Sequence, residues 1–226
     1  MVLSNMSDFS ANLAAVLHRV ERATVAAGRA PGSVALLAVT KTQPLDVVAA
    51  ARRAGMARFG TNYVREGIAQ IAAAPDAEWH YIGRLQSNKT RMVAERFAWV
   101  HTIDRISVAR RLSAQRPVGE PLHACLQVNV DDEPAKGGAA PEDIAALAAH
   151  VADLPGLRLR GLMAIPRADR DPRPAFTRVR ALFETLRADH PGLDTLSMGM
   201  SADLEAAIAE GATIVRVGTA LFGARA

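Results

Sequence analysis

Short apolar runs alternate with longer, alanine-rich amphipathic stretches along almost the whole chain, and this alternation restricts the possible folds more than any other feature of the sequence. We predict eight strands, at residues 34–40, 58–60, 79–83, 99–103, 123–130, 158–165, 195–198 and 213–217. The predicted helices between them cover residues 45–54, 63–73, 106–114, 141–153, 174–190 and 202–210, and only the connection around residues 89–96 is short. Strands that are separated by helices in this way form a parallel sheet.

The number of strands favours a closed barrel over an open sheet. Eight β/α units within residues 34–223 are the set that a (β/α)8 barrel of the TIM type requires. An open, Rossmann-like sheet is the alternative, although no Gly-x-Gly-x-x-Gly motif follows the first predicted strand. An N-terminal entry helix is predicted within residues 1–28, with Ser7 placed to cap its start and Gly28 to end it. We therefore expect a single α/β domain over residues 1–226.

The composition argues against an exported, membrane-bound or nucleic-acid-binding protein. No run approaches the roughly 20 apolar residues of a membrane span, and residues 1–10 lack the basic and apolar regions of an export signal. The 27 basic residues are scattered among 23 acidic ones and form no long cationic block. Cys125 is the only cysteine, and no two histidines stand at metal-ligand spacing. We expect a cytoplasmic protein without a metal site.

Lysine is rare in this chain. Of the 27 basic residues only Lys41, Lys89 and Lys136 are lysines, which leaves 24 arginines. Lysine can lose its proton and attack a carbonyl carbon, which arginine cannot do, so a surviving lysine is a candidate nucleophile. Lys41 directly follows the first predicted strand, at the end of the barrel where functional groups gather, and apolar walls there would favour a neutral amine. The alternative is a lysine that reaches from a strand end into water.

The segments after the last two predicted strands have the composition of a phosphate site. Ser201 is placed as the N-cap of the following helix, and Gly199, Gly218 and Thr219 would let the backbone approach a ligand closely. Ordinary turn and capping chemistry is the alternative, and Asp203 could itself supply the anion that the helix dipole favours. A lysine that traps an aldehyde, together with a phosphate cradle, indicates a site for pyridoxal 5′-phosphate.

Arg216 lies within the eighth predicted strand, where a buried charge needs a partner. If it points inward it could donate to the ring nitrogen of the cofactor and hold that nitrogen unprotonated, which makes the ring a weaker electron sink. A salt bridge to a carboxylate of the barrel is the competing interpretation. His80, in the third predicted strand, is by its position alone more typical of a core residue than of a catalytic base.

Several short motifs occur in order from the first predicted strand to nearly the last residue. They lie at residues 37–41, 59–66, 79–83, 85–89, 101–104, 129–130, 133–138, 161–166, 196–201 and 215–223. In these motifs the chain resembles the pyridoxal phosphate homeostasis proteins, also called the proline synthase co-transcribed homologue family. The resemblance implies a barrel like the N-terminal domain of bacterial alanine racemase, with the cofactor held as a Schiff base on Lys41.

The resemblance also assigns the remaining cofactor-binding residues. It implies phosphate contacts from Ser201, Gly218 and Thr219, a ring contact from Arg216, and pocket walls that include Asn62, His80, Met163 and Ser197. Where the family usually has Gly-Glu-Asn, this chain has Gly60-Thr61-Asn62, which removes a carboxylate expected near the site.

The function that the resemblance implies is vitamin B6 homeostasis. The protein would be a monomeric carrier, without catalytic residues, that keeps pyridoxal phosphate bound and releases it to apo-enzymes. An amino-acid racemase is the first alternative; it needs a second base, which in racemases of this fold is a tyrosine from a domain after the barrel, and the chain has only Tyr63 and Tyr81. A Schiff-base aldolase is the second, and it predicts no bound chromophore. Lys89 or Lys136 is a candidate for a transient second amine during cofactor loading or release.

Overall fold

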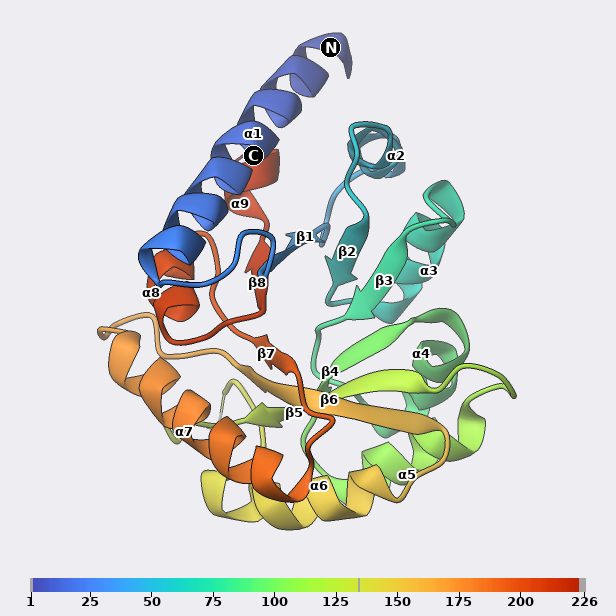
Figure 1. Cartoon of the computed structure of the whole chain (residues 1–226). Coiled ribbons are helices and arrows are strands. Elements are labelled where there is room, and N and C mark those ends of the chain that lie inside the picture. The colour runs from blue at the N-terminus through green and yellow to red at the C-terminus, as the bar shows by residue number, and fades with distance from the viewer. Residues whose placement is uncertain (1, 134, 224–226) are drawn as a thin grey trace.

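The structure, a computed structural model, describes residues 2–133 and 135–223 (Figure 1). Its strands are β1 Ala35–Val39, β2 Arg58–Thr61, β3 Glu78–Tyr81, β4 Trp99–Ile103, β5 Leu122–Val128, β6 Leu157–Ala164, β7 Thr195–Ser197 and β8 Ile214–Val217. Its α-helices are α1 Val2–Ala26, α2 Leu45–Arg53, α3 Val64–Ala73, α4 Thr90–Arg96, α5 Ile106–Gln115, α6 Ile144–Ala152, α7 Arg173–Asp189, α8 Leu204–Ala209 and α9 Thr219–Phe222. Two 3-10 helices, η1 Ser87–Lys89 and η2 Pro141–Asp143, precede α4 and α6.

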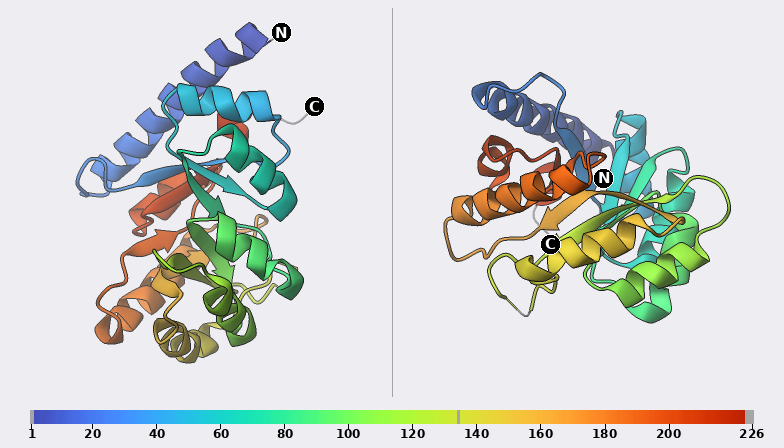
Figure 2. Two further views of the ribbon diagram at one scale, coloured as in Figure 1. Left: turned by 90° about the vertical axis from the view of Figure 1, so that its right-hand side faces the viewer. Right: turned by 60° about the horizontal axis from the view of Figure 1, so that its bottom comes forward.

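The eight strands form one closed parallel barrel, which confirms the predicted (β/α)8 fold and excludes the open sheet. The barrel closes between the first and last strands, where Leu37 of β1 is in register with Arg216 of β8. The helices cover the outside of the barrel (Figure 2). All the carboxyl ends of the strands therefore meet at one end of the barrel, which is the end where TIM barrels carry their sites.

Side chains alternate along each strand between the outside and the inside of the barrel, and the two faces form separate apolar clusters. Residues such as Ala38 and Phe59 belong to the main core, which in a (β/α)8 barrel lies between the strands and the surrounding helices. Smaller apolar clusters are separate from it, one of them formed by Leu37, Ile82 and Ile214. Because side chains of successive strand residues point to opposite faces, these clusters fill the barrel itself.

The predicted entry helix forms, but its start was predicted wrongly. Helix α1 begins at Val2 and runs through Ser7, so Ser7 does not cap it; residues 2–6 contain no glycine or proline that would stop the helix earlier. Gly28 follows the helix with a φ of 68°, as predicted for the residue that ends it. Helix α1 packs on α8 and α9 (Figure 1), where Arg19 pairs with Glu205 at 2.8 Å. None of the helices in the described residues is both long and apolar enough to span a membrane.

Candidate functional site

Lys41 lies in a tight turn directly after β1. The next residue, Thr42, has a φ of 65°, in the left-handed region that β-branched residues rarely adopt. Its backbone N–H donates to Oε1 of Glu66 on α3 at 2.6 Å. Since strained backbone persists only where its surroundings impose it, this contact helps to fix the position of Lys41.

A second residue of α3, the fully buried Gln70, holds the other side of the turn. Its Nε2 donates to the carbonyl oxygens of Thr40 at 2.9 Å and Gln43 at 3.2 Å, the residues on either side of Lys41 and Thr42. Its Oε1 accepts the hydroxyl of Thr40 at 2.8 Å. The sequence prediction missed Gln70, although a glutamine on the same helix face as the buried Val64 and Gly67 is a detectable signal.

A cavity of about 410 Å³ at the carboxyl ends of the strands brings together most of the predicted site. We call it the Lys41 cavity. It is lined by six of the nine predicted residues, namely Lys41, Asn62, Ser201, Arg216, Gly218 and Thr219. The remaining lining residues include Val39, Gln43, Ile82, Ile165 and Met200. One amine, hydroxyl groups, one guanidinium and apolar walls thus face the same space, as is typical of a small-molecule site.

The cradle after β7 and β8 is built differently from the prediction. Helix α8 begins at Leu204, so its N-cap is Asp203 and not Ser201, and the Asp203 carboxylate accepts the N–H of Met200 at 2.5 Å. The Ser201 hydroxyl instead accepts the N–H of Ala220 at 3.4 Å, which joins the two loops. The predicted capping role of Ser201 is therefore wrong, because its hydroxyl bonds to the loop after β8 and not to the first turn of α8.

Gly199 packs closely against α8 and does not line the Lys41 cavity, so its predicted approach to a ligand stays a prediction. Its φ is 92°, and a Cβ at this position would lie 2.6 Å from the Cβ of Ala207 on α8. Gly218 differs, because it lines the Lys41 cavity and a Cβ there would lie 3.3 Å from the carbonyl oxygen of Val39. Of these two glycines, Gly218 is the one that both packs closely against the backbone of β1 and lies at the cavity.

Arg216 points into the barrel and is 4% exposed. Its Nη1 donates to the carbonyl and hydroxyl oxygens of Ser197 at 2.5 and 2.9 Å, and its Nη2 donates to the carbonyl of Ala164 at 2.9 Å. It forms no ion pair with any carboxylate in the described part of the chain, so the predicted alternative of a salt bridge is not found. Burial lowers the pKa of Arg216 to about 10, so the side chain stays charged at neutral pH. Two of its five N–H donors are left without a partner among the described residues.

A chain of buried side chains extends from Arg216 through the barrel. The Ser197 hydroxyl lies 2.8 Å from Nδ1 of His101, and Nε2 of His101 lies 2.8 Å from Nδ1 of His80. Nε2 of His80 then contacts Oε1 of Glu78 at 2.9 Å, at the amino end of β3. The chain thus connects the Lys41 cavity with the opposite end of the barrel through β8, β7, β4 and β3.

The charges of the chain determine where its hydrogens lie. The hydrogen bond from His80 lowers the pKa of Glu78 to about 2, so this carboxylate is an acceptor and Nε2 of His80 is a donor. Burial lowers the pKa of His80, and lowers the pKa of His101 well below its usual range, so both rings are neutral at neutral pH. It follows that each ring carries its hydrogen on Nε2, and that the Ser197 hydroxyl donates to His101 while it accepts from Arg216.

His80, Met163 and Ser197 do not line the Lys41 cavity. All three are buried in the barrel at 1% exposure or less. His80 and Ser197 belong to the hydrogen-bonded chain, and Met163 packs with Trp99 and Cys125. Their predicted direct contact with a ligand stays a prediction, whereas the geometry places His80 and Ser197 behind Arg216.

Thr61, at the position where a carboxylate was expected near the site, faces away from the cavity. A Cβ added to Gly67 of α3 would meet Cγ2 of Thr61 at 2.5 Å and the ring of Phe97 at 2.8 Å, so the Thr61 side chain lies between β2 and α3. The next residue, Asn62, lines the cavity, and its Oδ1 is buried without a hydrogen-bond partner in the described part of the chain.

Comparisons with known proteins agree over nearly the whole chain. Residues 11–226 match the family described as alanine racemase, N-terminal domain. The chain is 56% identical over 226 residues to a pyridoxal phosphate homeostasis protein of Pseudomonas aeruginosa, covering 97% of each chain. It is 48% identical over 229 aligned positions to the protein of that name in Escherichia coli K12, covering 97% of this chain and 98% of the other. The solved structure of PipY of Synechococcus elongatus with PLP bound superposes with a TM-score of 0.77 at 37% identity, covering 90% of this chain and 99% of that chain.

Proposed function

Because the chain belongs to the family of pyridoxal phosphate homeostasis proteins, we propose that it binds pyridoxal 5′-phosphate as a Schiff base on Lys41 and buffers or supplies this cofactor in the cell. The ordered motifs of the sequence predicted this family, and the comparisons confirm it. The observation that carries the proposal is the Lys41 cavity, which places the amine, the hydroxyls of Ser201 and Thr219 and the guanidinium of Arg216 around one space.

The residues of the Lys41 cavity fit this cofactor. Bound pyridoxal phosphate supplies an aldehyde that condenses with amines and a pyridine ring that can accept electrons. Lys41 is the amine in reach, while Ser201, Gly218 and Thr219 would hold the phosphate with hydroxyl and backbone groups. The buried, unpartnered carboxamide oxygen of Asn62 offers a hydrogen-bond acceptor at the cavity wall.

Arg216 favours holding the cofactor over catalysis with it. A guanidinium that stays charged can only donate hydrogen bonds, so it would hold a facing ring nitrogen unprotonated. An unprotonated pyridine ring is a weaker electron sink, which disfavours reactions that pass through a carbanion. The chain of Ser197, His101 and His80 supports the guanidinium in this orientation.

The alternative of a racemase is disfavoured by the groups around Lys41. Racemisation requires two bases on opposite faces of the cofactor. The described lining of the Lys41 cavity contains no aspartate, glutamate, histidine, cysteine or tyrosine. Tyr81 is buried, its hydroxyl donates to the carbonyl of Arg84, and burial raises its pKa to about 12; Tyr63 lines a different cavity. The apo-enzymes that would receive the cofactor, and the monomeric state, are part of the same proposal.

The proposal is tested by trapping the Schiff base. The protein and its Lys41→Ala variant are incubated with pyridoxal phosphate, their visible absorbance is recorded, and borohydride reduction is followed by peptide mapping with mass spectrometry. Since Lys89 and Lys136 are the only other lysines, Lys89→Ala and Lys136→Ala are complete controls. We expect a yellow protein with phosphopyridoxyl on Lys41, in the wild type and in both controls.

Either of two results would contradict the proposal. A protein that stays colourless after incubation with the cofactor would favour the Schiff-base aldolase instead. Exchange of the α-hydrogen of alanine for solvent deuterium at a rate typical of enzymes, lost in Lys41→Ala, would favour the racemase.

A further inference from the structure

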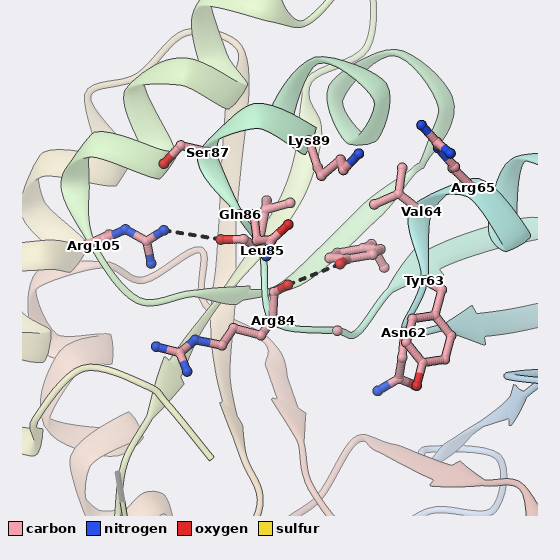
Figure 3. Close-up of a pocket in the computed structure, with 12 residues that line it drawn as sticks. Asn62, Tyr63, Val64, Arg65, Arg84, Leu85, Gln86, Ser87, Lys89 and Arg105 are labelled. Carbon is pink, nitrogen blue, oxygen red and sulfur yellow. Dashed lines mark hydrogen bonds between the residues drawn. The ribbon is translucent and has the colours of Figure 1, made fainter. Parts of the chain in front are cut away.

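A second cavity, of about 890 Å³, adjoins the Lys41 cavity at the carboxyl ends of β2, β3 and β4 (Figure 3). We call it the basic cavity. It is lined by Asn62, Tyr63, Val64, Arg65, Tyr81, Gly83, Arg84, Leu85, Gln86, Ser87, Lys89 and Arg105. Asn62 lines both cavities, so they are neighbours on the functional end of the barrel.

Among the residues that the structure describes, the lining of the basic cavity contains four cations and no carboxylate. Arg105 is occupied, because it pairs with Asp104 at 2.5 Å and donates to the carbonyl of Leu85 at 3.1 Å. The side chains of Arg65, Arg84 and Lys89 form neither an ion pair nor a hydrogen bond with any residue that the structure describes. Positive charges around a concave surface attract an anionic ligand.

The start of α3 adds backbone donors to the same wall. Tyr63, Val64 and Arg65 line the cavity at the first turn of this helix, which is 10 residues long. Its N-cap, Tyr63, makes no side-chain capping hydrogen bond. The first N–H groups of a helix without such a cap are available to bind a phosphate oxygen.

An exposed aromatic ring marks the type of ligand. Tyr63 is 57% exposed, so its ring is open to contact with a ligand. In Figure 3 the ring of Tyr63 lies at the lower right beside Asn62, the side chains of Lys89 and Arg65 lie above it near the top of the view, and those of Arg84 and Arg105 extend to the left. A planar ring can pack against Tyr63 while a phosphate attached to it reaches the two cations.

We propose that the basic cavity binds a small aromatic phosphate monoester, with its phosphate held by Lys89, Arg65 and the first turn of α3 and its ring packed against Tyr63. The volume of the cavity lies in the range of small-molecule sites. The proposal does not depend on the Schiff base, because neither Lys89, Arg65 nor Tyr63 lines the Lys41 cavity.

Phenyl phosphate is the probe, since it carries the ring and the phosphate but no aldehyde. Its binding is measured by calorimetry and by broadening of its phosphorus NMR signal, with wild type and with Arg65→Gln/Lys89→Gln. The matched control is Arg53→Gln/Arg110→Gln, which removes the same charge from exposed residues outside the cavity. We expect the first variant to bind phenyl phosphate at this site at least about tenfold more weakly than wild type, and the control to bind it with wild-type affinity.

The ring is tested separately from the charge. Tyr63→Ala should weaken the binding of phenyl phosphate but leave the affinity for inorganic phosphate unchanged, because only the ring contact is lost. Two natural classes of ring are compared by displacement of phenyl phosphate with pyridoxine 5′-phosphate and with adenosine 5′-monophosphate, and the stronger competitor identifies the ligand class. Equal affinity of wild type and Arg65→Gln/Lys89→Gln, or no displacement by either compound, overturns the proposal.

Discussion

Nδ1 of His80 and Nε2 of His101 lie 2.8 Å apart in the interior of the barrel, and neither ring is exposed to solvent. Two neutral rings can share one hydrogen in this contact, whereas two charged rings would repel each other and lose their hydration. The pair therefore couples the stability of the barrel to pH.

We predict that acidification from pH 7 to pH 5.5 destabilises the protein through this pair. The pKa of His101 is lowered well below its ordinary value of 6.5 by burial, so the unfolded chain binds a proton in this range that the folded chain does not, and the free energy of unfolding falls as the pH falls. The expected contribution of His101 to the free energy of unfolding is about 1 kcal/mol over this interval.

Urea denaturation at several pH values measures this contribution, and the free energy of unfolding of His101→Gln should depend less steeply on pH. His123, whose pKa burial also lowers, titrates in both proteins and cancels in the comparison. Parallel curves for the two proteins would show that His101 is protonated in the fold.

Replacement of Ser197 by alanine should affect both stability and the cofactor. Ser197→Ala removes the hydroxyl that links His101 to Arg216, leaving one buried acceptor and one buried donor unsatisfied. We expect a loss of about 1–3 kcal/mol in the free energy of unfolding and faster release of pyridoxal phosphate. Ser197→Cys, which keeps a weak donor of similar shape, should lie between alanine and wild type. Release kinetics followed by the visible absorbance would refute the link if Ser197→Ala were indistinguishable from wild type.

Gln70 is predicted to control the orientation of Lys41. Gln70→Met keeps the length of the side chain but removes the Nε2 donor from the carbonyl groups of Thr40 and Gln43, and the Thr40 carbonyl then keeps only the N–H of Gln43. We expect the variant to be about 1–3 kcal/mol less stable and to form the Schiff base more slowly, because the turn that carries Lys41 is no longer fixed. Gln115→Met at the end of α5 is the control, since that side chain is remote from the turn. Unchanged rates of Schiff-base formation, measured by stopped-flow absorbance, would contradict this role.

Close packing of Gly67 against Thr61 predicts a specific coupling. A Cβ at Gly67 would lie 2.5 Å from Cγ2 of Thr61, so Gly67→Ala should cost about 1–2 kcal/mol despite the better helix propensity of alanine. In a Thr61→Ser background, which lacks Cγ2, the same substitution should cost less, and the contact with the Phe97 ring at 2.8 Å accounts for the cost that remains. Gly192→Ala, where a Cβ meets nothing within 4 Å, serves as the control. Purely additive unfolding free energies would show that Thr61 does not face α3.

Lys89 and Lys136 differ in their readiness to act as a second amine. Nζ of Lys136 lies 3.0 Å from Oε2 of Glu133 and donates to the carbonyl of Pro166 at 2.6 Å. The side chain of Lys89, at the basic cavity, has neither an ion pair nor a hydrogen bond within residues 2–133 and 135–223. We predict that Lys89→Ala slows transfer of pyridoxal phosphate to an apo-enzyme, followed by the appearance of the activity of that enzyme. Lys89→Arg keeps the charge but cannot condense with an aldehyde, so it should be as slow as alanine if the amine reacts. Wild-type transfer by Lys89→Ala and by Lys136→Ala would exclude both lysines.

The sequence by itself determined the barrel. The alternation of strands and helices can be read from short segments, and any fold of the chain must bury the apolar face of each segment. It also determined that Lys41 lies at the end of a strand and, through the ordered motifs, which family the chain belongs to. The position of Ser201 outside the helix cap was decided by a contact between two loops, because its hydroxyl accepts the N–H of Ala220, 19 residues further along the chain, and local propensity does not reveal such a contact. Only the tertiary structure decided how His80, His101, Ser197 and Arg216 connect, since Ser197 and His101 are 96 residues apart and their contact depends on the register with which the barrel closes. That register also turns Thr61 toward α3, because a side chain in a strand faces the interior or the helices according to a shift of a single residue.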